Sequence, residues 1–306
     1  MSHDFFYQHM TISIIGLGLI GGSLALDLRA NGFASHLIGV DSNPEHARIA
    51  LDSGMVDEIC PLEEACIVSD IAVLAIPVGA VLTLMPRALS LISSEGVLVD
   101  MGSTKAEIAA AIARHPQRGR AVIAHPMAGT EYSGPQAAVS NLFHGKAAII
   151  CDADDSDRDA VQKVERLFKS LFMRIIHMPA QAHDTHVAYV SHVSHITSFV
   201  LALTVLEKEK SEAHIFNLAS GGFASTVRLA KSNPRMWADV YAQNRQNIVD
   251  VLDSYVERMI EFRELIRAGH FDETYRLMEA ANDIGRILRD QSSPRPETGQ
   301  RSGVGS

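Results

Sequence analysis

Cysteine and positive charge are scarce in this sequence of 306 residues. The three cysteines, Cys60, Cys66 and Cys151, have the spacing of neither a metal site nor a redox pair, which indicates reduced thiols of a cytoplasmic protein. Lys and Arg number 27 against 36 Asp and Glu, which gives a net charge of −9. Because phosphate binding needs a basic face, this balance argues against nucleic acid as a partner.

A secretory leader and a membrane span are also missing from the sequence pattern. The first ten residues, MSHDFFYQHM, lack the basic start and the long apolar run of a signal peptide. The longest apolar stretch, 71–85, is too short to span a bilayer and contains Pro77. We therefore expect a soluble, cytoplasmic protein with no membrane partner.

Short apolar runs alternate with helical patterns from residue 11 to about residue 178. Most of these runs are continuously apolar, which is typical of strands covered on both faces. The alternation predicts an α/β domain with a mostly parallel, doubly wound sheet. The expected strands are 11–16, 36–41, 71–77, 96–102, 121–126, 147–152 and 173–178, and the expected helices are 20–30, 44–53, 78–91, 105–114 and 157–171.

The pattern changes after Pro179, where helical patterns follow one another to about residue 290. Gly221-Gly222 and Ser232-Asn233-Pro234 are typical of breaks between helices, and 234–268 has the pattern of one long helical stretch. The sequence thus predicts an α/β domain over 11–178, an all-α domain over 179–291 and a disordered polar tail over 292–306.

A glycine-rich loop follows the first expected strand. In ISIIGLGLIGGSLA (12–25), Gly16, Gly18 and Gly21 have the GxGxxG spacing, with Leu19 and Ile20 between the last two. This pattern, placed between a strand and a helix, is typical of a Rossmann-type dinucleotide site. Asp41 ends the second expected strand, 20 residues after Gly21. A carboxylate there accepts hydrogen bonds from ribose hydroxyls and repels a 2′-phosphate, which favours NAD over NADP. The alternative is an ordinary tight turn and a solvated aspartate.

Two further strand ends carry chemically active side chains. His125 ends the run AVIAHP, and Ser103 lies in VDMGSTK. If NAD lies across the carboxyl ends of the strands, both residues face the nicotinamide, where a neutral imidazole acts as a general base. Ser103 would then orient His125 or bind the substrate. A histidine at a strand end can equally be a structural residue.

The helical half contains four histidines in HDTHVAYVSHVSH (183–195). Their spacing suits a shared metal site poorly, so we expect no metal. Ser191 and His195 are four residues apart and share one helix face. That face either points into the cleft expected between the two domains or forms a polar seam between packed helices. Arg228 lies in an expected helix of small and apolar residues. It either binds a substrate carboxylate or forms a structural salt bridge.

Taken together, these segments resemble the prephenate/arogenate dehydrogenase family of tyrosine biosynthesis. The resemblance covers about residues 11–285. The matching segments are GLGLIGGSLA (16–25), VD (40–41), DMGSTK (100–105), HPMAGTEYSG (125–134), HDxxxAYVSHVSH (183–195) and FASTVRLAKSNPRMWADVYAQN (223–244).

The resemblance implies an NAD-dependent oxidative decarboxylation of prephenate to 4-hydroxyphenylpyruvate. It implies that His125 is the base, with Ser103 beside it and also near the cofactor, and that Arg228 binds a substrate carboxylate. The further positions it places around the substrate or nicotinamide are His195, Ser191, Thr130 and His183. It also implies a homodimer formed through the helical domain, and it leaves too few residues after the last helix for a separate regulatory domain.

The family divides by substrate. Arogenate carries an ammonium group that an acidic residue would suit, whereas the SHVSH segment here supplies His195, so prephenate is favoured and arogenate is the alternative. Glu131 lies nearby and leaves that alternative open. A β-hydroxyacid dehydrogenase would leave His125 unexplained, and a non-catalytic NAD sensor would not need Ser103, His125 and Arg228 together.

Overall fold

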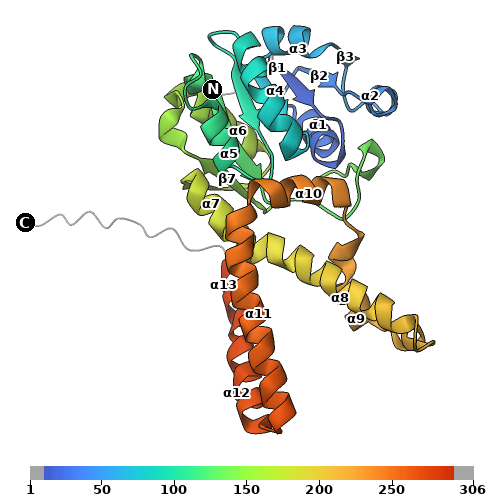
Figure 1. Cartoon of the computed structure of the whole chain (residues 1–306). Helices are drawn as coiled ribbons and strands as arrows, with labels where there is room; N and C mark the ends of the chain where they lie inside the picture. Colours follow the sequence, from blue (N-terminus) through green and yellow to red (C-terminus); the bar gives the residue numbers. More distant parts are fainter. Residues whose placement is uncertain (1–9, 293–306) are drawn as a thin grey trace, which may run out of the picture. The chain divides into compact units, whose positions relative to one another are not determined.

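An eight-stranded sheet forms the first part of the chain (Figure 1). The computed structural model describes residues 10–292. The strand order is β3-β2-β1-β4-β5-β6-β7-β8, and every neighbouring pair is parallel except β6 and β7. The strands are β1 (Thr11–Ile15), β2 (His36–Val40), β3 (Glu58–Ile59), β4 (Ile71–Leu74), β5 (Val97–Asp100), β6 (Ala121–Pro126), β7 (Ala147–Cys151) and β8 (Arg174–Met178). The predicted Rossmann-type, mostly parallel sheet is confirmed.

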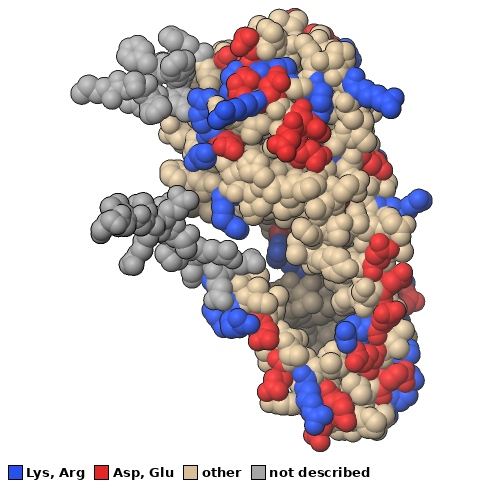
Figure 2. Space-filling view, turned by 90° about the vertical axis from the view of Figure 1, so that its left-hand side faces the viewer, with Lys and Arg blue, Asp and Glu red and all other residues tan. Residues whose placement is uncertain are grey.

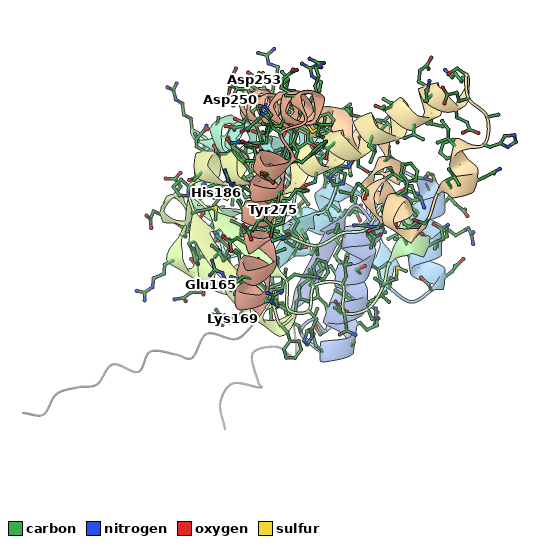
Figure 3. The ribbon with its side chains drawn as sticks, turned by 90° about the horizontal axis from the view of Figure 1, so that it is seen from below. Glu165, Lys169, His186, Asp250, Asp253 and Tyr275 are labelled. Atoms are coloured by element: carbon green, nitrogen blue, oxygen red, sulfur yellow. The ribbon has the colours of Figure 1, made fainter. Side chains whose placement is uncertain are left out.

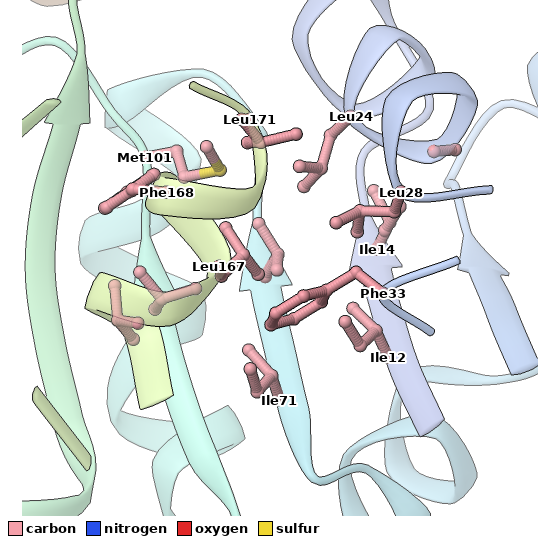
Figure 4. Packing of buried hydrophobic residues seen from close by; sticks show 14 of the residues in the cluster. Ile12, Ile14, Leu24, Leu28, Phe33, Ile71, Met101, Leu167, Phe168 and Leu171 are labelled. Carbon is pink, nitrogen blue, oxygen red and sulfur yellow. The ribbon is translucent and has the colours of Figure 1, made fainter. Parts of the chain in front are cut away.

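Helices cover both faces of this sheet. They are α1 (Leu19–Asn31), α2 (Pro44–Asp52), α3 (Leu62–Val68), α4 (Val78–Leu91), α5 (Ala106–Ile112) and α6 (Arg158–Ser170). Because successive strand residues point to opposite sides, Ile12 and Ile14 of β1 lie in one buried core with α1 and α6. Ile15 lies in a second core with α4 and α5. Figure 4 shows part of the first core, where Leu28 of α1 and Leu167 of α6 converge on the strands.

Two short elements, β3 and α3, were absent from the expected set. Helix α3 follows Pro61 and carries Glu63 and Glu64 in its first turn. A proline before a helix and acidic residues in its first turn are start signals, so the beginning of α3 is predictable from the sequence. Strand β3 has two residues, too few to show any periodicity.

The described chain is helical from Ala180 onward. The helices are α7 (Ala180–Val187), a π-helical segment (Ala188–His192), α8 (Val193–Glu209), α9 (Gly221–Thr226), α10 (Pro234–Gln243), α11 (Arg245–Ala268), α12 (Phe271–Ala281) and α13 (Asp283–Ser292). The long stretch expected over 234–268 is interrupted at Asn244. Asn233 caps α10 by accepting a hydrogen bond from the Arg235 backbone N–H at 3.0 Å, as the predicted break requires.

The chain divides into two compact units, one ending at Val251 and one beginning at Leu252. The first unit holds the sheet and the helices through α10, and the second holds most of α11 with α12 and α13. The domain boundary expected at 178/179 stays a prediction. The disordered tail expected over 292–306 lies outside the described residues, except for Ser292 at the end of α13.

The helical stretch Ala180–Glu209 is long and apolar enough to cross a membrane, judged by length and composition alone. Only 11% of its most apolar window is buried, and Val200, Leu203 and Leu206 of α8 are each more than half exposed. The sequence pattern singles out 71–85 as the longest apolar stretch instead of this one. Serine, threonine and histidine interrupt the apolar run here without adding full charges, so the helix remains apolar on average.

Exposed charges form many pairs of opposite sign. Arg48 of α2 bonds Glu45 at 2.7 Å and Asp52 at 2.6 Å, and Glu165 pairs with Lys169 along α6 (Figure 3). Figure 2 shows acidic and basic side chains interspersed over the visible face. Exposed pairs of this kind contribute roughly 0–1 kcal/mol each, so the stability of the sheet domain rests mainly on its two cores.

Candidate active site

The loop between β1 and α1 has the shape that a pyrophosphate site requires. Gly16 has φ +97°, and a Cβ there would lie 2.5 Å from the Ala75 carbonyl oxygen. A Cβ at Gly21 would lie 1.9 Å from the Gly16 carbonyl oxygen. At Gly18, by contrast, nothing lies within 4 Å of the Cβ position. Packing therefore demands glycine at Gly16 and Gly21, and Gly18 leaves room for a phosphate beside the first turn of α1.

Asp41 lies beside this loop, directly after β2. Its Oδ2 accepts a hydrogen bond from the Leu17 backbone N–H at 2.8 Å, and its Oδ1 accepts one from the Asn43 backbone N–H at 2.8 Å. The side chain is 10% exposed. A carboxylate held in this way has lone pairs left for two ribose hydroxyls and repels a 2′-phosphate, so these residues fit NAD.

Replacing Asp41 tests this cofactor preference. Asp41→Asn keeps an acceptor oxygen for the Leu17 N–H but removes the negative charge. We expect the ratio of the dissociation constants for NADP and NAD to fall by roughly 10–100-fold, which corresponds to about 1.4–2.8 kcal/mol. Calorimetric titration with both nucleotides measures this ratio, with Asp52→Asn on the exposed face of α2 as the control. An unchanged ratio would show that the ribose does not bind at Asp41.

Strands β5 and β6 end at the same edge of the sheet as β1 and β2, because these four strands are parallel. Ser103 follows β5 and is half-buried, and His125 lies in the last residues of β6 and is also half-buried. Both residues therefore lie at the edge where a dinucleotide bound at the glycine loop places its reactive end.

His125 is hydrogen-bonded to a second histidine. Its Nδ1 lies 2.8 Å from Nε2 of His183 on α7, and the two rings meet edge to face with centroids 5.0 Å apart. Nδ1 of His183 lies in turn 2.8 Å from Oδ1 of Asp184. Within residues 10–292, Ser103 makes no hydrogen bond to His125 and His125 Nε2 has no protein partner. The orienting contact that sequence reasoning considered for Ser103 is thus made by His183.

Both of these histidines are held neutral. Burial lowers the pKa of His125 well below its ordinary value of 6.5, and the protonated form of His183, the Lys105 charge and the protonated form of His192 act in the same direction. Burial also lowers the pKa of His183, opposed by its hydrogen bond to Asp184. At neutral pH His125 therefore has a free lone pair, which is the protonation state that a general base requires.

A fully buried ion pair lies beneath this histidine pair. Lys105 Nζ bonds the Asp100 carboxylate and donates a hydrogen bond to the Ala124 carbonyl oxygen at 2.7 Å, and both charged side chains are 0% exposed. The other oxygen of Asp100 accepts from the Gly102 backbone N–H at 2.8 Å. Because Ala124 precedes His125, the ion pair ties the loop after β5 to the end of β6.

Two further histidines gather around Trp237. His195 stacks on the Trp237 ring, with centroids 3.7 Å apart, and its Nδ1 donates to the Ser191 carbonyl oxygen at 3.0 Å. His192 is buried, and its Nδ1 accepts a hydrogen bond from Asn244 Nδ2 at 3.2 Å. Burial lowers the pKa of His192 to about 4. Ser191 and His195 were expected to share one helix face, and the contact between them is the bond to the Ser191 backbone oxygen.

Arg228 lies in a 3-10 turn after α9, not in a continuous helix as expected, because the α-helix ends at Thr226. Its guanidinium bonds Glu131 Oε2 at 2.8 Å; the arginine side chain is 51% exposed and the glutamate 13%. Its positive charge also adds to burial in lowering the pKa of His195. Arg228 and His195 therefore share one region, and Thr130 is exposed next to Glu131.

Sequence reasoning missed three polar residues around the site, namely Lys105, Asp184 and Asn244. All three lie in segments that carry the family resemblance, 100–105, 183–195 and 223–244, and Asp184 directly follows His183. In the part of the chain that the structure describes, no three His, Cys, Asp or Glu side chains are grouped so that they could hold a metal ion.

Two family models match the chain in succession. Residues 24–177 match the nucleotide-binding domain of prephenate dehydrogenase, and residues 179–280 match the model described as the prephenate dehydrogenase dimerization domain.

Individual relatives agree with these models. The chain is 31% identical to a prephenate dehydrogenase of Bacillus subtilis over 92% of this chain and 78% of that protein. It is 28% identical to a cyclohexadienyl dehydrogenase of Zymomonas mobilis over 93% of this chain and 98% of that one. A crystal structure of Aquifex aeolicus prephenate dehydrogenase in complex with hydroxyphenyl propionate and NAD+ superposes with a TM-score of 0.82 and 27% identity, covering 94% of this chain and 99% of that chain.

Proposed function

The chain belongs to the prephenate dehydrogenase family, and we propose on this premise that it converts prephenate and NAD to 4-hydroxyphenylpyruvate, CO₂ and NADH in tyrosine biosynthesis. The observation that carries the proposal is a neutral imidazole at the sheet edge next to the dinucleotide loop. No residue of the described chain bonds Nε2 of His125 there, and His183 holds its other nitrogen.

The reaction requires a proton acceptor at the C4 hydroxyl of the substrate. When bound, NAD supplies the acceptor for the C4 hydride. His125 Nε2 takes the hydroxyl proton, which helps the hydride to leave. The ring carboxylate departs as CO₂, and its bonding electrons aromatise the ring to a phenolate. His125 then returns the proton to the phenolate, so the base is regenerated and no net proton is consumed.

The other residues bind and orient. Gly16, Gly18, Gly21 and the helix residues 19–20 would hold the pyrophosphate, and Asp41 the ribose. Ser103, on the loop after β5, would contact the nicotinamide. For the substrate we assign a carboxylate to Arg228, with His195, Ser191, Thr130 and His183 around it.

The charges near Arg228 favour prephenate over arogenate. An ammonium group on the substrate side chain would need a free carboxylate, and Glu131 is already paired with Arg228 at 2.8 Å. His195 contributes no negative charge. The alternative is an arogenate or dual-specificity cyclohexadienyl dehydrogenase that forms tyrosine directly, as the similarity to the Zymomonas mobilis protein allows.

One assay tests the function and its alternative together. Purified protein is supplied with prephenate or arogenate, each with NAD or NADP, and the reduced nucleotide is followed by absorbance. We expect the highest kcat/KM with prephenate and NAD. Higher kcat/KM with arogenate would establish the alternative, and no reduced nucleotide with either substrate would exclude both.

Removing Arg228 is expected to weaken substrate binding. Hydrogen bonds to a charged group contribute about 1.5–3 kcal/mol, so Arg228→Ala should raise the KM for prephenate roughly 10–150-fold at nearly constant kcat. Arg235→Ala is the control, since it removes the same charge from an exposed position on α10. A loss of thermal stability with an unchanged KM would show that Arg228 serves only its salt bridge with Glu131.

We also propose a homodimer formed through the helical part, located in the cytoplasm. The apolar face of α8 is exposed in a single chain, and the family model over 179–280 is described as a dimerization domain. The same helical stretch carries His183 and Asp184, which bond residues of the sheet domain, so lipid is not a suitable environment for it. The three cysteines are free thiols, as is usual in the reducing cytoplasm.

A further inference from the structure

Asp184 is held in place from two sides. Its Oδ1 accepts a hydrogen bond from the Lys105 backbone N–H at 2.8 Å, and its Oδ2 accepts one from the Ala106 backbone N–H at 2.9 Å. The residue is 1% exposed. The side chain thus cannot rotate without breaking bonds to the start of α5, and its acceptor oxygens stay aimed at these donors and at His183.

The directions of the hydrogen bonds in the Asp184–His183–His125 chain follow from this fixed carboxylate. A carboxylate only accepts, so Nδ1 of His183 carries the hydrogen in the 2.8 Å contact with Asp184. Nε2 of neutral His183 is then an acceptor, and Nδ1 of His125 must donate to it. Nε2 of His125 is left as a lone pair.

We propose that Asp184 is a positioning residue that fixes the tautomers of both histidines, so that Nε2 of His125 is the atom that accepts the substrate proton. This inference rests on the proposed function for the identity of that proton. Asp184 is 1% exposed and acts on His125 only through His183.

Without the carboxylate, the opposite arrangement would satisfy the histidine pair equally well. Nε2 of His183 would donate to Nδ1 of His125, and Nε2 of His125 would carry a hydrogen. In that state the imidazole cannot take a proton from the C4 hydroxyl. The two arrangements have the same contacts between the rings, and Asp184 is the group that distinguishes them.

The carboxylate also balances the charge that the reaction creates. When His125 Nε2 takes the proton, the ring becomes an imidazolium whose Nδ1–H still donates to His183. His183 is polarised in the same direction by its bond to Asp184, so the positive charge is stabilised through one intervening ring. A buried aspartate behind a catalytic histidine acts in the same way in serine proteases, although there it contacts the catalytic ring directly.

Nitrogen NMR on the intact wild-type protein tests the tautomers without any substrate. The chain has 14 histidines, which are labelled with 15N and assigned from the spectra of His125→Asn and His183→Gln. At a pH where the rings are neutral, we expect His125 and His183 both to carry hydrogen on Nδ1. A hydrogen on Nε2 of His125 in the wild type would overturn the proposal.

Asp184→Asn tests whether the carboxylate is the cause. We expect kcat to fall about 10²-fold or more, within the range of a general base, with unchanged Kd for NAD and a populated Nε2–H form of His125. The control is Asp154→Asn, on an exposed turn after β7. The proposal would be overturned if kcat and the tautomers were unchanged while the melting temperature fell. Asp184 would then serve only to cap α5.

The test of Asp184 gives a result that is independent of the test of the proposed function. If the wild type converts neither prephenate nor arogenate, the function fails, but the tautomers measured by NMR stand. If Asp184→Asn does not fold, the wild-type spectrum still decides the tautomers.

Discussion

His125→Asn is expected to lower kcat with prephenate by about 10²–10⁴-fold, the usual contribution of a positioned general base. The replacement is mild for the fold. In the wild type, Nδ1 of His125 lies 2.8 Å from Nε2 of His183. An asparagine amide at position 125 can still donate a hydrogen bond to this Nε2. The amide has no basic nitrogen, however, so it cannot remove the C4 hydroxyl proton. Steady-state kinetics with prephenate and NAD measure the loss.

His186→Asn is the matched control for this experiment. His186 lies on α7, close in sequence to His183, and is exposed (Figure 3). We expect its kcat to equal that of the wild type. The Kd for NAD should be unchanged in both variants, because the glycine loop and Asp41 are untouched. A His125→Asn variant that keeps more than about a tenth of the wild-type kcat would contradict the role of base.

The pH dependence of kcat provides a second readout. Burial, together with protonated His183, the Lys105 charge and protonated His192, holds the pKa of His125 well below 6.5. The ring is therefore neutral and active at pH 6.5, and kcat should fall only when the pH drops through this lowered pKa. His125→Asn should lose that acidic limb along with most of the rate. A wild-type limb above pH 6.5 would show that another group controls the reaction.

Local sequence patterns predicted every strand of the sheet except the two-residue β3, and they predicted the glycine loop. Continuous apolar runs mark strands buried on both faces, and Gly16 and Gly21 are dictated by contacts with neighbouring backbone that the GxGxxG spacing anticipates. The helix expected through Arg228 was wrong because small residues permit both an α-helix and a 3-10 turn. The π-helical segment at 188–192 likewise has no local signal in the sequence.

The interior of the candidate site was predictable only in part. His125 and Ser103 follow from their positions at strand ends, but the partner of His125 is 58 residues away in the sequence and Asp184 bonds backbone 79 residues away. Such pairs depend on how α7 packs against α5, which no local pattern encodes. A buried lysine in the segment VDMGSTK is similarly invisible, because lysine is rarely buried fully unless it is paired.

That lysine gives the largest expected effect on stability. Lys105→Met removes the partner of Asp100 but keeps a side chain of similar length, and it leaves a carboxylate that is 0% exposed without its counter-charge. Breaking a buried ion pair in this way costs about 3–5 kcal/mol. Urea-induced unfolding measures the change in the free energy of unfolding. Lys208→Met on α8 is the control, since its pair with Glu212 is more than half exposed on both sides and should contribute less than about 1 kcal/mol.

The double variant Lys105→Met with Asp100→Asn separates the unpaired charge from the lost packing. The amide that Asp100→Asn introduces carries no charge, and its oxygen can still accept the Gly102 N–H bond that Asp100 accepts at 2.8 Å. If the cost of Lys105→Met arises from the stranded carboxylate, the double variant should be more stable than Lys105→Met alone by about 1–3 kcal/mol, the penalty for a buried polar group left without its partner. Equal stability would instead assign the loss to the hydrogen bond between Lys105 and the Ala124 carbonyl. In that case the lysine's main contribution would be to fix the end of β6, directly before His125.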